Sequence, residues 1–307
     1  MKNIVTGGAG FIGSHLIDNL MNNGEDVVCI DDFSSGNQQN IDHWKKNSRF
    51  SLINHDIEEP INIETDRIWH LACPASISKY QQDPIKTSKT NFIGTLNMLQ
   101  LSKKTKATFL LASTSEVYGE PQEHPQKEEY LGSVNSIGIR SCYVEGKRMA
   151  ESLTFDFARK YNLDIKIARI FNSYGPRIRP NDGRVISNFI SQALRNKPFT
   201  IYGNGKQTRS FCFIKDLIDG LIKLMNSKYT GPINIGNPEE CNILELAKII
   251  NDKAGNKFKF INFPLQENDP VRRKPDITYA KNALLWTPKI NLSDGLDQTI
   301  NYSKNFY

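Results

Sequence analysis

Short apolar runs alternate with amphipathic stretches along the first half of the chain. The apolar runs are Ile4–Val5, Val27–Ile30, Phe50–Ile53, Ile68–Ala72, Phe109–Ala112 and Ile165–Ile170. Helical patterns between them cover Phe11–Asn22, Thr90–Lys103 and Tyr143–Lys160. This alternation gives βαβ units, and right-handed crossovers then place helices on both faces of a parallel sheet. The sequence therefore predicts an α/β fold with a doubly wound parallel sheet.

The pattern changes after Asn172. Residues Tyr174–Gly183 are rich in Pro, Asn and Gly, which is typical of a loop. Helical patterns then alternate with short strand signals, at Val185–Asn196, Lys215–Asn226 and Ile243–Ala254. We therefore expect a first domain over residues 1–173 and a smaller, interleaved α/β domain over 174–307, with segments that return to the first sheet. Such a domain would cover the carboxyl ends of the strands, where ligands of open α/β sheets bind.

A glycine pattern follows the first strand directly. Gly7, Gly10 and Gly13 stand between that strand and the first helix. In a dinucleotide-binding turn these positions permit the tight turn, the approach of a pyrophosphate and close helix–strand packing. The helix N-terminus would offer its N–H groups to the phosphates. A glycine-rich turn without a ligand is the alternative.

Acidic residues end the second strand and follow the third. Asp31 and Asp32 come 18 and 19 residues after Gly13, where a carboxylate accepts both ribose hydroxyls and repels a 2′-phosphate. This position favours NAD over NADP and argues against a glycine-rich turn that binds no ligand. Asp56 could accept a hydrogen bond from the adenine amino group, or it could simply be a turn residue.

Tyr143 and Lys147 have i, i+4 spacing and would share one face of a helix. A lysine cation beside a phenol favours the phenolate, so we expect a pKa below the usual value of about 10. A tyrosinate could then take a proton from a sugar hydroxyl while a hydride leaves the same carbon. Thr114, at the end of the fifth strand, could hydrogen-bond the reacting oxygen.

Composition narrows the class of protein. The chain of 307 residues has a net charge of +6, but its Lys and Arg residues are scattered, which favours an enzyme that handles anions over a nucleic-acid binder. Five cysteines without a Cys-x-x-Cys pair argue against disulfides and zinc, and we expect no metal. The sequence shows no leader pattern and no run of 18 apolar residues, so we expect a cytoplasmic enzyme that uses no membrane.

Together these residues resemble the extended short-chain dehydrogenase/reductase family, in its NAD-dependent epimerase/dehydratase group. The resemblance covers the whole chain and is most specific in four stretches, Leu111–Gly119, Asn181–Ile190, Gln207–Phe211 and Asn268–Ile277. The last of these resembles the arginine loop of UDP-glucuronate decarboxylases. It implies a Rossmann domain with NAD contacts from Gly7, Gly10, Phe11, Ile12, Gly13, Asp31, Asp32, Ser34, Ser35, Gly36, Asp56, Ile57, Leu71, Ala72, Cys73, Thr90, Ala112, Tyr143 and Lys147. It implies UDP-sugar contacts from Pro74, Lys89, Asn172, Arg184, Val185, Tyr202, Gln207, Arg209 and Arg273.

The triplet Thr114-Ser115-Glu116 favours one reaction within this family. Sugar 4,6-dehydratases usually carry Thr-Asp-Glu, and serine cannot replace the aspartate as the acid that expels a hydroxyl. The resemblance implies oxidation at carbon 4 of UDP-glucuronate, loss of carbon dioxide from the β-keto acid, and re-reduction to UDP-xylose. Glu116 is expected to position the carboxylate and handle the proton at carbon 5, through Ser115 or water, although Tyr143 could protonate the enolate oxygen instead. Arg273 would hold the sugar acid or its pyrophosphate.

Several alternatives remain open from the sequence. The enzyme could be a 4,6-dehydratase, a 4-epimerase or a decarboxylase that releases the 4-keto pentose; an NAD-binding sensor is a further alternative. Glu116 could be a structural acid paired with an arginine, and Arg209 and Arg273 could form surface ion pairs. Cys142 is more simply a small buried residue than a nucleophile. Two helical stretches, Thr90–Lys103 and Tyr143–Lys160, resemble the pair that joins two subunits in this family, so we expect a homodimer.

Overall fold

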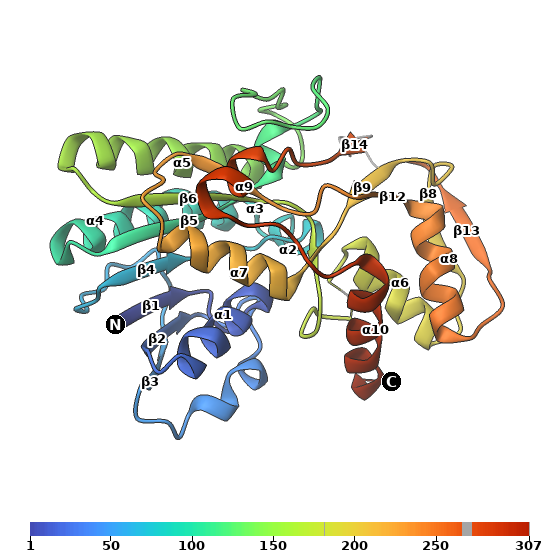
Figure 1. Cartoon of the computed structure of the whole chain (residues 1–307), viewed down its shortest axis with the longest axis horizontal. Helices are drawn as coiled ribbons and strands as arrows, with labels where there is room; N and C mark the ends of the chain where they lie inside the picture. The colour runs from blue at the N-terminus through green and yellow to red at the C-terminus, as the bar shows by residue number, and fades with distance from the viewer. Residues whose placement is uncertain (181, 266–271, 307) are drawn as a thin grey trace.

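A seven-stranded parallel sheet forms the centre of the computed structural model, which describes residues 1–180, 182–265 and 272–306 (Figure 1). The strand order is β11-β6-β5-β4-β1-β2-β3. Its strands are β1 (Lys2–Thr6), β2 (Asp26–Asp31), β3 (Phe50–Asn54), β4 (Arg67–His70), β5 (Thr108–Thr114), β6 (Ile165–Ile170) and β11 (Pro232–Ile235). Each apolar run of the first half is a strand, because β-branched and aromatic side chains suit a sheet that is buried on both faces. The predicted doubly wound parallel sheet is confirmed.

Helices cover both faces of this sheet. Helices α1 (Phe11–Asn22) and α7 (Ile214–Met225) pack together on one face, whereas α4 (Thr95–Thr105) and α5 (Ser141–Tyr161) pack together on the other (Figure 1). The short helices α2 (Ile77–Tyr80) and α3 (Pro84–Lys89) lead into α4, and α9 (Thr278–Leu284) lies against β11. Two apolar clusters fill the layers between helices and sheet, and Trp69 of β4 is fully buried in one of them. Burial of this kind is the main force that fixes the layers.

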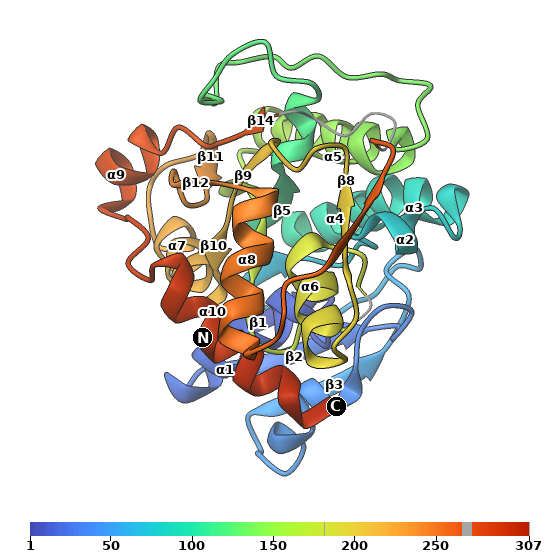
Figure 2. The same cartoon turned by 90° about the vertical axis from the view of Figure 1, so that its right-hand side faces the viewer.

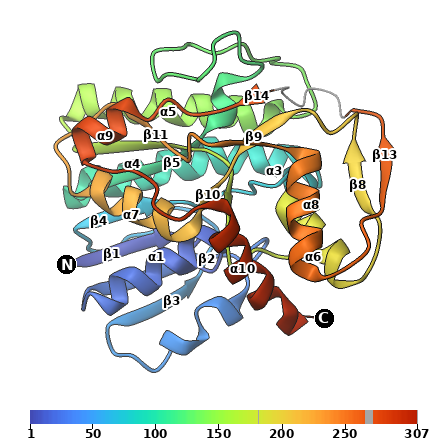
Figure 3. The ribbon, with the colours of Figure 1, turned by 45° about the vertical axis from the view of Figure 1, so that its right-hand side comes forward.

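The second half of the chain builds a smaller unit beside the carboxyl ends of the strands (Figure 2). It contains α6 (Val185–Leu194), α8 (Ile243–Ala254) and α10 (Leu292–Ser303), which pack against one another. Three small sheets complete the fold, and Figure 3 shows β8 and β13 side by side at the edge of the unit. Their strands are β7 (Ser173–Tyr174), β8 (Phe199–Tyr202), β9 (Thr208–Ser210), β10 (Cys212–Phe213), β12 (Glu240–Asn242), β13 (Phe260–Phe263) and β14 (Arg272–Arg273).

The first strand of the chain lies in the interior of the large sheet. Strand β1 lies between β2 and β4, so the strands that follow wind outward from it in two directions. The crossovers on the two sides of β1 therefore diverge, which opens a crevice at the carboxyl ends of β1 and β4. The glycine turn leaves β1 at this point, and the residues after β4 and β5 reach the same edge.

One predicted helix differs from the structure. The stretch Thr90–Lys103 is not one α-helix, because Thr90–Gly94 forms a π-helical turn before α4 begins. The side chain of Thr90 donates to Glu58, and that of Asn91 donates to the Thr87 carbonyl, so polar contacts hold this turn. Such π-turns occur often beside functional sites.

Candidate active site

The glycine turn has the geometry that a dinucleotide needs. Gly7 has a φ of +67°, and a Cβ added there would lie 2.9 Å from the backbone of Ala72. A Cβ at Gly13 would lie 2.3 Å from the Gly7 carbonyl oxygen. Only glycine fits at these two positions, and the backbone therefore turns tightly at the start of α1. The N-terminus of α1 faces the same cavity as this turn, as a pyrophosphate site requires.

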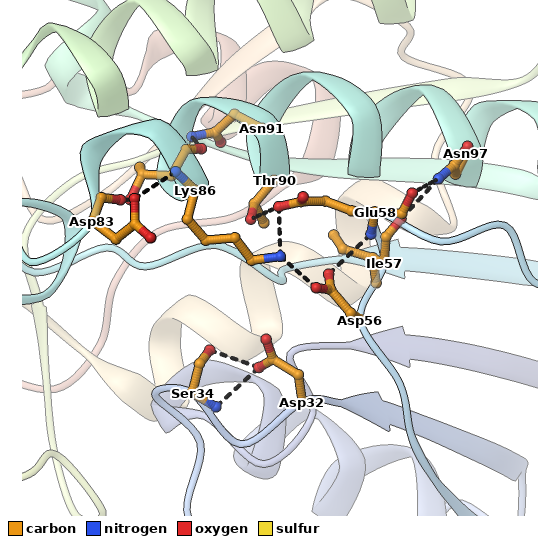
Figure 4. Close-up of polar contacts among 11 residues, drawn as sticks. Asp32, Ser34, Asp56, Ile57, Glu58, Asp83, Lys86, Thr90, Asn91 and Asn97 are labelled. Atoms are coloured by element: carbon orange, nitrogen blue, oxygen red, sulfur yellow. Dashed lines mark hydrogen bonds and ion pairs between the residues drawn. The ribbon is translucent and has the colours of Figure 1, made fainter.

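The carboxylate of Asp31 lies against the glycine turn. Its Oδ2 accepts the Ala9 N–H at 2.9 Å and its Oδ1 accepts the Phe33 N–H at 2.8 Å. Burial raises the pKa of Asp31, whereas these two backbone hydrogen bonds lower it. Asp32 points away into its own loop, where it accepts the N–H and hydroxyl of Ser34 (Figure 4). Asp31 is therefore the acid that the fold holds rigidly, as a ribose contact requires.

A cluster around Lys86 borders the same end of the cavity (Figure 4). The Lys86 ammonium extends from α3, contacts the Asp56 carboxylate and lies 2.7 Å from Glu58 Oε1. Asp56 also accepts the Glu58 N–H at 3.0 Å, and its pKa is lowered by Lys86 and this backbone bond although its partial burial opposes them. Sequence reasoning did not include Lys86, because its carboxylate partners lie about 30 residues away in the chain.

The Tyr143 phenol lies in the wall of the cavity, one turn before Lys147 on α5. Its ring stacks on that of Tyr80 with centroids 5.1 Å apart and an interplanar angle of 1°. Burial raises the pKa of Tyr143 above its ordinary value; charge on Cys73 and Glu116 adds to this, whereas a hydrogen bond with Thr114 lowers it. This direction is opposite to the lowering that the sequence predicts, because desolvation outweighs the polar contacts that the chain itself supplies.

Glu116 lies between two arginines. Its Oε1 is 2.7 Å from Arg140 Nη2 and 3.6 Å from Arg273 Nη1. Glu116 follows β5, Arg140 directly precedes α5, and Arg273 is in β14, so three distant segments meet here. Glu116 therefore pairs with arginines, as the sequence allowed, and it also lines the cavity. Sequence reasoning missed Arg140; a charged residue three positions before Tyr143 was the one available signal.

One cavity of about 930 Å³ joins these groups. All the predicted catalytic residues line it, as do all the predicted cofactor-binding residues except Gly36. Among the predicted substrate-binding residues, Pro74, Asn172, Arg184, Val185, Tyr202, Gln207, Arg209 and Arg273 line it. Lys89 does not, because its side chain is exposed at the end of α3. Gly36 lies just outside the wall, where its carbonyl accepts a 2.6 Å hydrogen bond from Arg179.

Two of the arginines that line the cavity come from one small sheet. Arg209 and Arg273 are register partners on the parallel strands β9 and β14, so their side chains leave the same face of that small sheet. Parts of two motifs that the sequence singles out, Asn181 and residues 268–271, lie outside the described residues. The side chains that remain form a basic wall, which suits the phosphates or carboxylate of an anionic substrate.

The described residues contain neither a membrane-spanning helix nor a metal-binding cluster. Within 1–180, 182–265 and 272–306, no helix is both long and apolar enough to cross a membrane. Over the same ranges, no group of three or more His, Cys, Asp or Glu side chains is arranged to hold a metal ion.

Comparison with known proteins assigns the chain to a family. A family model described as GDP-mannose 4,6 dehydratase matches residues 4–299. The chain belongs to this family. The sequence-based assignment to the NAD-dependent epimerase/dehydratase group is thereby confirmed.

Within the family, the similar proteins have related names. UDP-glucuronic acid decarboxylase 4 of Arabidopsis thaliana is 55% identical over 96% of this chain and 67% of its own length. UDP-glucuronic acid decarboxylase 3 of the same plant is 54% identical, over 96% of this chain and 87% of its own length. A crystal structure of UDP-glucuronic acid 4-epimerase from Bacillus cereus, in complex with UDP-glucuronic acid and NAD, has a TM-score of 0.89. It is 32% identical and covers 100% of both chains.

Proposed function

We propose that this family member is an NAD-dependent UDP-glucuronate decarboxylase that makes UDP-xylose. The observation that carries the proposal is the set Thr114, Ser115 and Glu116 at the end of β5, with Arg273 beside Glu116. No carboxylic acid stands at position 115 to expel the 6-hydroxyl of a neutral sugar, so a dehydratase would lack its acid. Relatives that match 96% of this chain at 54–55% identity carry the name UDP-glucuronic acid decarboxylase.

The chain provides a fitting NAD site. The Gly7 and Gly13 cradle would hold the pyrophosphate, Asp31 would accept the ribose hydroxyls, and Asp56 would accept from the adenine amino group. When bound, NAD takes the hydride from carbon 4 of the sugar and returns it later, and its positive nicotinamide ring favours the Tyr143 phenolate. That positive charge would offset the rise in the Tyr143 pKa that burial causes.

The chemical steps use residues of this chain. Tyr143 accepts the proton of the 4-hydroxyl while Thr114 holds the oxygen by a hydrogen bond. Lys147, buried on the same helix, supplies positive charge beside the phenolate. The resulting 4-keto acid loses carbon dioxide because the carbonyl accepts the electron pair of the breaking bond as an enolate. Glu116 positions the sugar carboxylate and handles the proton that ends at carbon 5, and Arg273 binds an anionic group of the substrate.

We further propose the division of labour and the assembly. Residues 1–173 bind NAD and 174–307 mainly bind the UDP-sugar; strand β11 of the second half extends the first sheet. The α4–α5 face supports a homodimer, because α5 exposes Met149 there and a shallow groove lies over Gln100, Lys103, Lys104, Phe157 and Tyr161. A cytoplasmic location stays a prediction from the sequence.

A panel of substrates tests the proposed reaction. Purified protein with NAD is given UDP-glucuronate, UDP-glucose or dTDP-glucose, and both carbon dioxide and 4-keto-6-deoxy sugar are measured. We expect carbon dioxide from UDP-glucuronate alone and no deoxy sugar from the other two. A deoxy sugar from either hexose, with no carbon dioxide from UDP-glucuronate, would make the protein a dehydratase.

Asp31 should determine the choice of cofactor. Asp31→Ala removes two charge-assisted hydrogen bonds to ribose, each worth about 1.5–3 kcal/mol, so NAD should bind at least tenfold more weakly. NADP should lose less, because the carboxylate that repels its 2′-phosphate is gone. Calorimetric titration of both dinucleotides checks this, with Asp219→Ala as the control, because Asp219 pairs with Lys223 on α7 and does not line the cavity. Tighter binding of NADP than of NAD to the unaltered protein would contradict the assignment.

Lys86 should orient Asp56 toward adenine. Lys86→Met removes both ammonium contacts, and we expect NAD to bind about fivefold more weakly, since a partly exposed ion pair contributes about 1 kcal/mol. Lys104→Met is the control, because Lys104 donates to Asn62 in an exposed pair 2.8 Å apart and does not line the cavity. Nicotinamide hypoxanthine dinucleotide lacks the adenine amino group, so its affinity should hardly change. Equal losses for both dinucleotides would show that Lys86 supports the fold rather than adenine recognition.

A further inference from the structure

The arginine that precedes the catalytic helix connects two parts of the site. The Arg140 carbonyl accepts the N–H groups of Tyr143 and Val144, both at 3.1 Å, and thereby begins α5. Its guanidinium donates to Glu116 Oε1 at 2.7 Å. Arg140 therefore ties the acid that follows β5 to the helix that carries Tyr143. Both charged side chains are mostly buried, with 11% of Arg140 and 15% of Glu116 exposed.

Two arginines face Glu116 among the residues that the structure describes. Arg140 and Arg273 both approach this one carboxylate. The contact with Arg140 is a short hydrogen bond, whereas Arg273 lies 3.6 Å away and beside its register partner Arg209. Arg140 is thus the close partner of Glu116, and Arg273 is the guanidinium placed to bind a second anion.

A sugar acid brings one such anion. The carboxylate of UDP-glucuronate would enter a site whose wall already contains Glu116, and two carboxylates close together in a buried site repel strongly. A neutral sugar such as UDP-glucose meets no such repulsion. Selective binding of an acidic sugar therefore requires that the negative charge of Glu116 be compensated by a cation other than the one that holds the substrate.

We propose that Arg140 is a positioning residue that neutralises Glu116, and that this neutralisation lets Arg273 bind the carboxylate of the sugar. This inference rests on the proposed function, because it concerns UDP-glucuronate as the substrate. Arg140 itself touches neither the substrate nor the cofactor in this scheme. Its effect reaches the substrate through Glu116, and it selects acidic over neutral sugars in the same site.

The test is a comparison of binding ratios on the NAD-loaded protein. Dissociation constants for UDP-glucuronate and UDP-glucose are measured by calorimetry for the unaltered protein, R140M, R140K and the double variant E116Q/R140M. We expect R140M to weaken UDP-glucuronate at least about tenfold relative to UDP-glucose, since an uncompensated like charge costs several kcal/mol in a buried site. R140K keeps the charge and should lose less of the preference. R159M is the control, because Arg159 is exposed and forms an ion pair with Asp156 on α5, away from the residues that line the cavity.

The double variant separates a charge effect from a structural one. E116Q/R140M has no carboxylate left to repel the sugar acid, so the preference for UDP-glucuronate should return to within about threefold of the unaltered value. A purely structural Arg140 would give equal losses for both sugars and no recovery, and either result overturns the inference. If R140M fails to fold, the double variant, which leaves no carboxylate at position 116 without its arginine, still decides: loss of the preference there overturns the inference.

Failure of the proposed function has a different signature. Absence of carbon dioxide from UDP-glucuronate with the unaltered protein would remove the decarboxylase assignment. The binding ratios would still report whether Arg140 controls the preference for an acidic sugar, because they require no turnover. A normal ratio in R140M together with normal decarboxylation by the unaltered protein would remove the inference and leave the function in place.

Discussion

Replacing Tyr143 by Phe should reduce turnover of UDP-glucuronate by a factor of about 10²–10⁴, the usual effect of losing a general acid–base group. The variant keeps the ring that stacks on Tyr80 at 5.1 Å, so the packing of α5 against α2 should stay intact. Only the hydroxyl that accepts the substrate proton is lost. Steady-state rates of carbon dioxide release measure the effect.

Binding separates this loss of chemistry from a loss of structure. The dissociation constants of NAD and UDP-glucuronate should change by less than about threefold, because the phenol contributes one hydrogen bond. Tyr80→Phe is the matched control: it removes the hydroxyl of the other ring in the stack and should leave most of the activity. Near-normal turnover in Tyr143→Phe would show that another group is the base.

The second large effect is expected at Glu116. Glu116→Gln should slow carbon dioxide release by about 10², because the amide can neither accept the proton that Glu116 handles nor hold the sugar carboxylate out of the ring plane. The hydride step depends on Tyr143, Lys147 and Thr114, so it should continue. In this variant, transfer of a deuterium label from carbon 4 to the cofactor should therefore still be detected although product forms slowly.

Two observations would contradict that role. Glu116→Gln with unchanged carbon dioxide release would make Glu116 a structural acid that only pairs with Arg140 and Arg273. Loss of NAD binding in the same variant would indicate a distorted site instead. Glu120→Gln is a matched control, because Glu120 is exposed four residues later in the chain and lines no part of the cavity.

Much of the fold followed from local patterns in the sequence. The glycine turn could be predicted because its requirement is local: Gly7 must adopt a positive φ, and Gly13 must let its neighbours approach within van der Waals distance. The six strands of the first half were visible because a parallel sheet buries both faces, which demands continuous apolar runs. Strand β11 was harder to place, since a four-residue strand in the second half joins the first sheet only through tertiary contacts.

The parts that escaped prediction depend on contacts between distant residues. The π-turn at Thr90–Gly94 is held by a hydrogen bond from Thr90 to Glu58, 32 residues away, which helix periodicity does not reveal. The sequence placed Tyr143 beside Lys147 but gave no measure of burial, so it did not reveal that burial raises the pKa of this tyrosine in the chain by itself. Arg140 and Lys86 were missed for a related reason, because their carboxylate partners are 24 and 30 residues away.

The most direct measurement of the central claim follows the complete reaction by NMR. Catalytic amounts of the protein, with NAD, are mixed with UDP-glucuronate labelled with ¹³C at carbon 6 in deuterated water, and NADH absorbance is recorded in parallel. The account predicts one labelled carbon dioxide for each UDP-xylose, one deuteron at carbon 5 of the product and no accumulation of NADH. Labelled carbon that stays in a hexuronate, as an epimerase would leave it, or no reaction at all, would contradict the account.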